Sequence, residues 1–118
     1  MNNAFEVRLE SVLNMMDSKP DEAIAELETI INDAEVEDLR YYQGKAKWYK
    51  AYIYDRVLED ISYGYHFYNE ALKDVLVTDD SSLKMKIYNN LGILYRCIIR
   101  KSGEGIYHVI GVRRTNQL

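Results

Sequence analysis

The sequence predicts an all-α protein made of stacked antiparallel helix pairs. Apolar residues recur at intervals of three and four through most of the chain, the spacing that places side chains on one face of a helix. The clearest run is Ile61, Gly64, Tyr65, Tyr68, Ala71, Leu72, Val75 and Leu76. Only one proline and six glycines interrupt the 118 residues. A similar pattern returns after about 40 residues, with Trp48 matched to Tyr88, and repetition at this period is typical of an α-solenoid.

Turn signals divide this pattern into five helices. Ser18 is the candidate N-cap of the second helix, and Pro20 lies in its first turn. Residues 58–60 form a tight turn before the fourth helix, and the polar stretch 78–82 precedes the fifth. The expected helices cover residues of about 3–16, 20–34, 39–57, 60–77 and 83–101.

Length and pattern predict one domain. We expect about two and a half helix pairs over residues 1–101, followed by a weakly patterned segment over 102–118. Within that segment, residues 106–110 fit either a sixth helix or a brief strand. Trp48 is expected to be buried between helix pairs. Gly92 lies inside the fifth helix, and we expect another helix to approach it closely.

The charge distribution bears on partners and location. The formal net charge is −4, which argues against direct binding of nucleic acid. Acidic residues concentrate between Asp17 and Asp38, and basic residues concentrate after Arg96. No apolar run is long enough to span a bilayer, and the first residues do not begin a secretory signal. We therefore expect a cytoplasmic protein with no membrane partner.

Signals for catalysis are poor. His66 and His108 have no cysteine or carboxylate at metal-ligand spacing, and no glycine-rich phosphate loop is present. Cys97 is the only cysteine, so the chain cannot form an internal disulfide. Helix capping accounts for the acidic and hydroxyl residues of 79–82. The sequence thus predicts no enzyme activity, no metal and no cofactor.

Three stretches resemble the tetratricopeptide repeat. They are Trp48-Tyr49-Lys50-Ala51-Tyr52 followed by Gly64, Tyr68 and Ala71-Leu72; Tyr88 to Tyr95; and Pro20-Asp21-Glu22-Ala23-Ile24. The resemblance covers about residues 5–100 and departs from the family pattern at Tyr52 and Asp55. The period of about 40 is similar to the extended repeats of peptide-pheromone receptors in Gram-positive bacteria, which regulate transcription factors or phosphatases.

This resemblance implies a non-catalytic regulatory module that binds an extended peptide or a partner segment in a concave groove. The residues at candidate groove positions are Tyr49, Lys50, Ile53, Arg56, Lys86, Asn89, Asn90, Ile93 and Arg96. Asn90 falls where peptide-binding repeats often carry an asparagine. Its carboxamide can both donate to and accept from a peptide backbone.

Two alternatives remain open from the sequence. The protein is a self-associating helical module if a second copy covers the exposed face of the fifth helix. It is a small-molecule binder if Tyr49, Tyr52, Tyr63 and Phe67 form one aromatic cluster.

Overall fold

The computed structural model describes residues 3–102, and all regular structure in this range is helical. The elements are α1 (Asn3–Met15), α2 (Pro20–Val36), α3 (Arg40–Tyr52), the π-helical turn η1 (Ile53–Val57), α4 (Ile61–Leu76) and α5 (Ser81–Ser102). The five expected helices are confirmed, with bounds that differ by a few residues. The π-helical end of α3 was not expected. The predictions for residues 103–118, including the segment 106–110, lie outside the described residues.

Local chemistry explains where the helices begin. Asp60 accepts a hydrogen bond from the backbone N–H of Tyr63 at 3.1 Å, and Asp80 accepts one from Leu83 at 2.7 Å. These two aspartates cap α4 and α5, as expected for the stretch before α5. The predicted cap of α2 was wrong, because α2 begins at Pro20 and no side chain caps it. Proline needs no hydrogen-bond partner for its nitrogen at this position.

The two tight turns use non-glycine residues in a left-handed conformation. Asp38, between α2 and α3, has a φ of 57°, and Glu59, between η1 and α4, has a φ of 55°. Acidic residues adopt this region at a modest cost, Asp more readily than Glu. This explains how residues 58–60 reverse the chain without a glycine.

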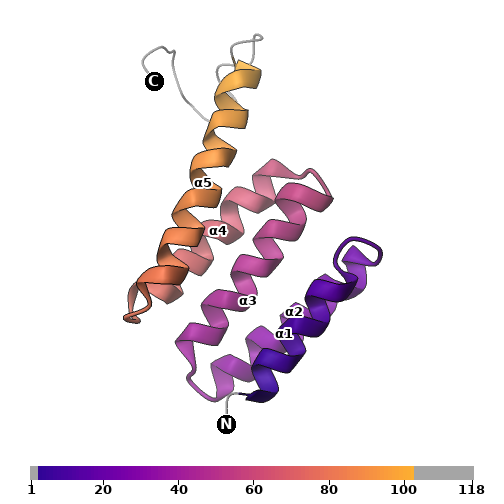
Figure 1. The fold of residues 1–118 in the computed structure, drawn as a ribbon, viewed down its shortest axis with the longest axis vertical. Helices are drawn as coiled ribbons and strands as arrows, with labels where there is room; N and C mark the ends of the chain where they lie inside the picture. Colours follow the sequence, from indigo (N-terminus) through magenta and orange to yellow (C-terminus); the bar gives the residue numbers. More distant parts are fainter. Residues whose placement is uncertain (1–2, 103–118) are drawn as a thin grey trace.

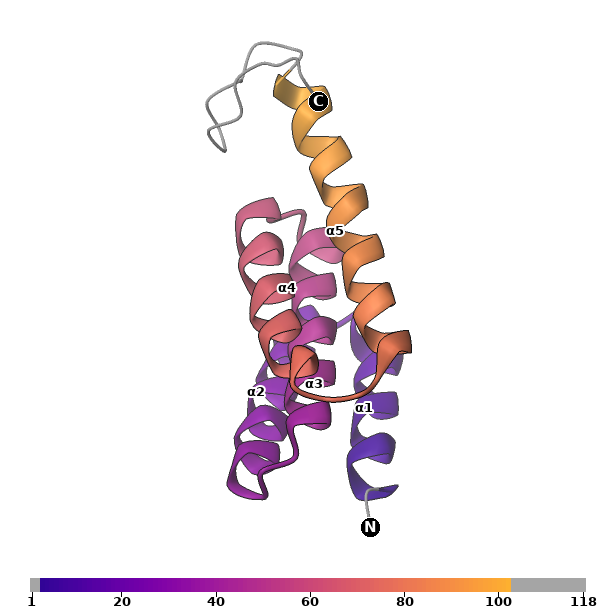
Figure 2. The same ribbon diagram turned by 90° about the vertical axis from the view of Figure 1, so that its left-hand side faces the viewer.

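α3 lies at the centre of the molecule. Figure 1 shows it between the α1–α2 pair and α5, and Figure 2 shows α2 and α4 on one side with α1 and α5 on the other. Polar contacts agree with this arrangement. Tyr42 of α3 donates a hydrogen bond to Glu6 of α1 at 2.8 Å, and Trp48 of α3 donates one to Asn90 of α5 at 2.7 Å.

The core divides into two clusters on either side of α3. The first joins α1, α2 and α3 around the fully buried Leu9, Leu27 and Ile30. The second joins α3, α4 and α5 around Tyr68 and Ile87. Tyr41 packs against both clusters. α3 therefore connects the two core clusters.

Two sequence predictions about packing need correction. A Cβ atom on Gly92 would meet no neighbouring atom within 4 Å among the described residues, so no helix approaches it there. The close approach occurs instead at Gly44, where a Cβ would lie 2.6 Å from Cγ2 of Val75 in α4. Trp48 is half-buried rather than enclosed, with its ring at the edge of the second cluster.

Candidate functional site

One side of α3 carries a row of half-buried aromatic rings. Tyr41, Lys45, Trp48 and Tyr52 follow one another at intervals of four, three and four residues, so they share one helical face, and Tyr49 borders it. All are intermediate in exposure. We call these five residues, with Lys86 and Asn90 of α5, the aromatic face. Half-exposed tyrosine and tryptophan rings offer apolar area together with polar tips.

The α5 border of the aromatic face is fixed by Trp48. Its indole N–H donates to the carboxamide oxygen of Asn90, and the ammonium of Lys86 lies 5.9 Å from the centre of its ring. The amide nitrogen of Asn90 has no hydrogen-bond partner within residues 3–102. Asn90 therefore has a fixed orientation and, as far as the described residues go, a donor without a partner on the same face as the rings.

The α1 border is built from ion pairs and hydrogen bonds. Glu6 accepts a hydrogen bond from the Tyr42 hydroxyl at 2.8 Å and contacts the ammonium of Lys45 at 3.3 Å. Burial of Tyr42, together with its hydrogen bond to Glu6, raises the pKa of Tyr42 to about 12. The ammonium of Lys45 also lies 5.5 Å from the centre of the Tyr41 ring. These contacts hold α1 against α3 and keep this edge of the face in place.

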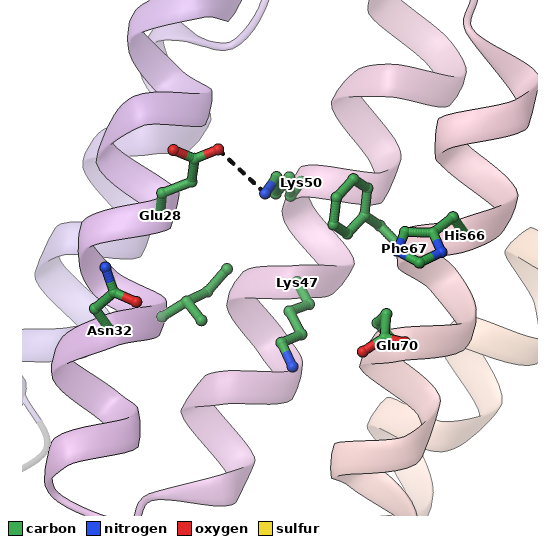
Figure 3. Close-up of a pocket in the computed structure, with 8 residues that line it drawn as sticks. Glu28, Asn32, Lys47, Lys50, His66, Phe67 and Glu70 are labelled. Carbon is green, nitrogen blue, oxygen red and sulfur yellow. Dashed lines mark ion pairs between the residues drawn. The ribbon is translucent and has the colours of Figure 1, made fainter.

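A pocket lies on a different side of α3, between α2 and α4 (Figure 3). Its volume is about 320 Å³, and it is lined by Glu28, Ile31, Asn32, Lys47, Lys50, His66, Phe67 and Glu70. Lys50 is only 8% exposed. Figure 3 shows it between Glu28, at 3.2 Å, and the ring of Phe67, whose centre is 4.2 Å from the ammonium. The buried cation is thus neutralised by groups of the protein itself.

A second cavity, of about 290 Å³, shares Ile31 and Lys47 with the first. Asp74 lies in it, 8% exposed, with Lys47 at 2.8 Å and Arg40 at 3.8 Å. Gln43 is 7% exposed, and its carboxamide oxygen has no hydrogen-bond partner among the described residues. An acceptor in this environment is suited to an ordered water, since the cavity is polar and large enough for one. Any charged ligand here would have to displace existing ion pairs.

The π-helical turn positions a half-buried carboxylate. Asp55 accepts a hydrogen bond from the hydroxyl of Tyr68 at 3.0 Å, and Gly64 leaves room for its backbone, since a Cβ there would lie 2.9 Å from Cβ of Asp55. Burial raises the pKa of Asp55, although the hydrogen bond from Tyr68 and the charge of Arg56 oppose the rise. Burial also raises the pKa of Tyr68, with the Asp55 charge acting in the same direction. This pair joins α3 to α4 and accounts for the departure from the repeat pattern at Asp55.

The structure separates the residues that the sequence proposed for one groove. Tyr49, Lys86 and Asn90 lie on the aromatic face. Ile93 lies on the same side of α5 by its spacing, and Arg56 is exposed beside the ring of Tyr52 at 5.7 Å. Asn89 and Arg96 are exposed residues of α5, further around the helix.

Lys50 lies in the pocket between α2 and α4, and Ile53 is completely buried in the first cluster. The last two residues are therefore not available on the aromatic face.

Sequence reasoning missed Tyr41, Lys45 and Trp48 as members of this surface. Their spacing of four and three residues, continued to Tyr52, was the available signal. The proposed small-molecule cluster is also divided. Phe67 and Tyr63 pack against Tyr54, with ring centres at 5.7 and 5.0 Å, whereas Tyr49 packs against Trp48 at 5.5 Å.

No family model, no curated protein and no solved structure matches this chain. Within residues 3–102, no three or more His, Cys, Asp or Glu side chains gather closely enough to hold a metal ion. In the same range, no helix has both the length and the apolar character needed to cross a membrane. The candidate site therefore stands on the geometry of the aromatic face alone.

Proposed function

We propose that the protein is a non-catalytic helical-repeat module, similar to tetratricopeptide repeats, that binds an extended peptide or partner segment on the aromatic face. In this proposal α1 with α2 and α3 with α4 form two repeats, and α5 is the first helix of a third. The contacts of α3 with α1 on one side and α5 on the other support the stacking of first helices. The resemblance of residues 88–95 to a first helix agrees with it.

The observation that carries the proposal is the combination of half-exposed rings with the oriented carboxamide of Asn90. The rings of Tyr41, Trp48, Tyr49 and Tyr52 provide apolar surface for side chains. The amide nitrogen of Asn90 provides a donor whose direction is set by Trp48. The hydrogen bond from Trp48 holds this carboxamide in one orientation, so little conformational entropy is lost there when a ligand binds.

An extended ligand fits this donor better than a helical one. The backbone carbonyls of a helical ligand are already bonded within that ligand, whereas those of an extended segment are free to accept from Asn90. The row of rings then receives alternate side chains of the segment. Lys86, which no acidic side chain contacts within residues 3–102, is available to a carboxylate of the ligand.

The aromatic face is also favoured over the pocket as the binding surface. Lys47 and Lys50, the cations of the pocket, contact Asp74 and Glu28, and a ligand would leave these acids without partners. Breaking such partly buried pairs costs free energy that a small ligand rarely recovers. On the aromatic face, Lys86 makes no ion pair within residues 3–102, so a ligand carboxylate can contact it without breaking one.

Selection from a random peptide library against the full chain tests the proposal. We expect enriched peptides whose affinity falls by about 1–2 kcal/mol with Tyr49→Ala or Asn90→Ala. Tyr63→Ala, which changes an exposed tyrosine of α4, is the matched control and leaves the affinity unchanged. Circular dichroism of each variant verifies the fold. If no peptide is enriched, or if enriched peptides bind all three variants equally, the proposal is wrong.

A further inference from the structure

The outward side of α5 carries a second apolar stripe, which lies outside the two core clusters of the described residues. Met85, Tyr88, Gly92, Tyr95 and Ile99 follow one another at intervals of three and four residues, which places them on one face. We call these residues the α5 stripe. Met85 is 65% exposed, Tyr88 48% and Tyr95 40%. The core contacts of α5 are made by a different face, formed by Leu83, Ile87, Leu91, Leu94 and Ile98.

Gly92 lies at the centre of the α5 stripe, where the described residues leave open space. Glycine is unfavourable in a helix interior, so a glycine there needs a packing reason. Gly44 and Gly64 have such reasons, because a Cβ on either would lie within 3 Å of a neighbouring atom. Within the described residues nothing lies within 4 Å of a Cβ on Gly92. A gap of this kind in an apolar stripe lets the backbone of another helix approach closely.

Basic residues flank the α5 stripe. α5 carries no acidic residue, and Lys84 lies at one edge of the stripe while Arg96 and Arg100 lie at the other. No acidic side chain within residues 3–102 pairs with these three cations. By contrast, Arg8, Lys45, Lys47 and Lys50 all pair with carboxylates of neighbouring helices.

We propose that the α5 stripe docks an acidic amphipathic helix of a partner protein. The partner would place apolar residues along the stripe, a small residue opposite Gly92, and Asp or Glu side chains beside Lys84, Arg96 and Arg100. Recognition of an amphipathic helix by an apolar surface with complementary charge is a common mode of peptide binding. This surface and its ligand differ from those of the aromatic face.

The cations of α5 and the gap at Gly92 favour a partner helix over a second copy of the chain and over a membrane surface. Pairing α5 with α5 of a second copy would oppose cations with cations, which is unfavourable across a desolvated interface. A membrane surface would also attract the cations, but it gains nothing from the gap at Gly92. Tyr95 is further held edge-on by Tyr65 of α4, with ring centres 5.9 Å apart. This contact limits the movement of one ring of the stripe.

Two synthetic helical peptides test the proposal with the full chain. Both carry leucine at helical spacing and alanine at the centre; one has glutamate and the other lysine on the flanks. Fluorescence anisotropy of the labelled peptides is expected to show at least roughly tenfold tighter binding of the acidic peptide, weakened by added salt. If neither peptide binds, or if both bind equally, the proposal is overturned.

Variants locate the peptide on the protein. Tyr88→Glu and Gly92→Leu are expected to weaken binding of the acidic peptide by at least roughly tenfold. Tyr63→Glu and Ala25→Leu, at exposed positions of α4 and α2, are the matched controls and leave it unchanged. Gly92→Ala is expected to raise the melting temperature while weakening binding, a combination that a purely structural role for this glycine would not produce. Equal binding by Gly92→Leu and Ala25→Leu would contradict the proposal.

Two further results would replace the partner helix with another occupant. Sedimentation that shows a dimer of the full chain, converted to a monomer by Tyr88→Glu, would assign the α5 stripe to a second copy. Binding to phosphatidylserine vesicles that Tyr88→Glu abolishes would assign it to a lipid surface. Tyr49→Ala separates this proposal from the proposed function, because it is expected to leave binding of the acidic peptide unchanged.

Discussion

At the α1 end of the molecule, charged side chains contact neighbouring helices. Arg8 contacts Glu26 at 3.4 Å and Asp33 at 2.9 Å, and Glu6 contacts both Lys45 and Tyr42. At the α5 end, Lys84, Arg96 and Arg100 make no ion pair within residues 3–102, and apolar side chains remain exposed beside them. The comparison teaches that α1 contributes its charges to contacts within the fold, whereas these three cations of α5 contribute none among the described residues.

Truncating a core residue in each half gives the largest expected effect. We expect Leu27→Ala in the first cluster and Leu94→Ala in the second each to lower the free energy of unfolding by about 2–5 kcal/mol. Because α3 packs against both clusters, each variant should still unfold in a single transition. Chemical denaturation monitored by circular dichroism measures both quantities. Two separated transitions would show that the α1 and α5 ends are independent units.

The same substitution at two glycines is expected to have opposite effects. Gly44→Ala should lower the free energy of unfolding by about 1–3 kcal/mol, because the new Cβ would lie 2.6 Å from Val75 and force α3 away from α4. Gly92→Ala should raise it by up to about 1 kcal/mol, because alanine favours the helix and the space is open. Thermal melts of both variants compare them directly. Destabilisation by Gly92→Ala would mean that the outward side of α5 is already covered.

Each half also contains a tyrosine that donates to a carboxylate. We expect Tyr68→Phe to cost about 1–2 kcal/mol, because the half-buried Asp55 loses its donor, and Tyr42→Phe to cost less, because Glu6 keeps its contact with Lys45. Denaturation at neutral pH measures this difference. Equal costs would indicate that water replaces the lost hydrogen bond equally well at Asp55 and at Glu6.

The same tyrosines predict a loss of stability at alkaline pH. The folded pKa of each lies above the ordinary value near 10, and that of Tyr42 is about 12. Their contribution is therefore fully present below about pH 10 and is lost as the pH rises through the folded pKa values. A variant with both Tyr42→Phe and Tyr68→Phe should lose less stability between pH 9 and pH 11 than the natural chain. Identical pH profiles would contradict these pKa shifts.

Removing one arginine from each end gives the smallest effect. Arg8→Ala should cost about 0.5–1 kcal/mol, because its two ion pairs are partly exposed to solvent. Arg96→Ala should cost nothing measurable, because its side chain pairs with no acid in the described part of the chain. Unfolding at low and high salt distinguishes them, since only the Arg8 effect should shrink with salt. A larger loss of unfolding free energy from Arg96→Ala than from Arg8→Ala would contradict this comparison of the two ends.

The sequence predicted the helices because their apolar spacing and breaks are local signals. Pro20 marked the start of α2, and Asp80 capped α5. The π-helical turn was not predictable, because it depends on the contact of Asp55 with Gly64 and Tyr68 across the turn. The role of Gly92 was misjudged for the same reason. Spacing shows that a glycine is present, but only the arrangement of helices shows whether anything approaches it.

The candidate site was predicted only in part. Helical spacing placed Tyr49 and Asn90 toward a common face, and both lie on the aromatic face. It could not assign Lys50 or Ile53 correctly, because Lys50 of α3 contacts Glu28 of α2, and Ile53 of η1 is buried in the first cluster. Which faces of a helix are buried depends on where the neighbouring helices pack. The spacing in a single sequence shows which residues share a face, but it does not show which helix covers that face.

The resonance of the Trp48 indole N–H tests the central claim most directly. Trp48 is the only tryptophan of the chain, so its signal in a ¹H–¹⁵N correlation spectrum is unambiguous. A peptide selected on the full chain is predicted to shift this resonance progressively during titration, because the indole donates to Asn90 within the aromatic face. The same titration with the acidic helical peptide should leave it unchanged. A selected peptide that binds to saturation without moving the Trp48 resonance would contradict the account.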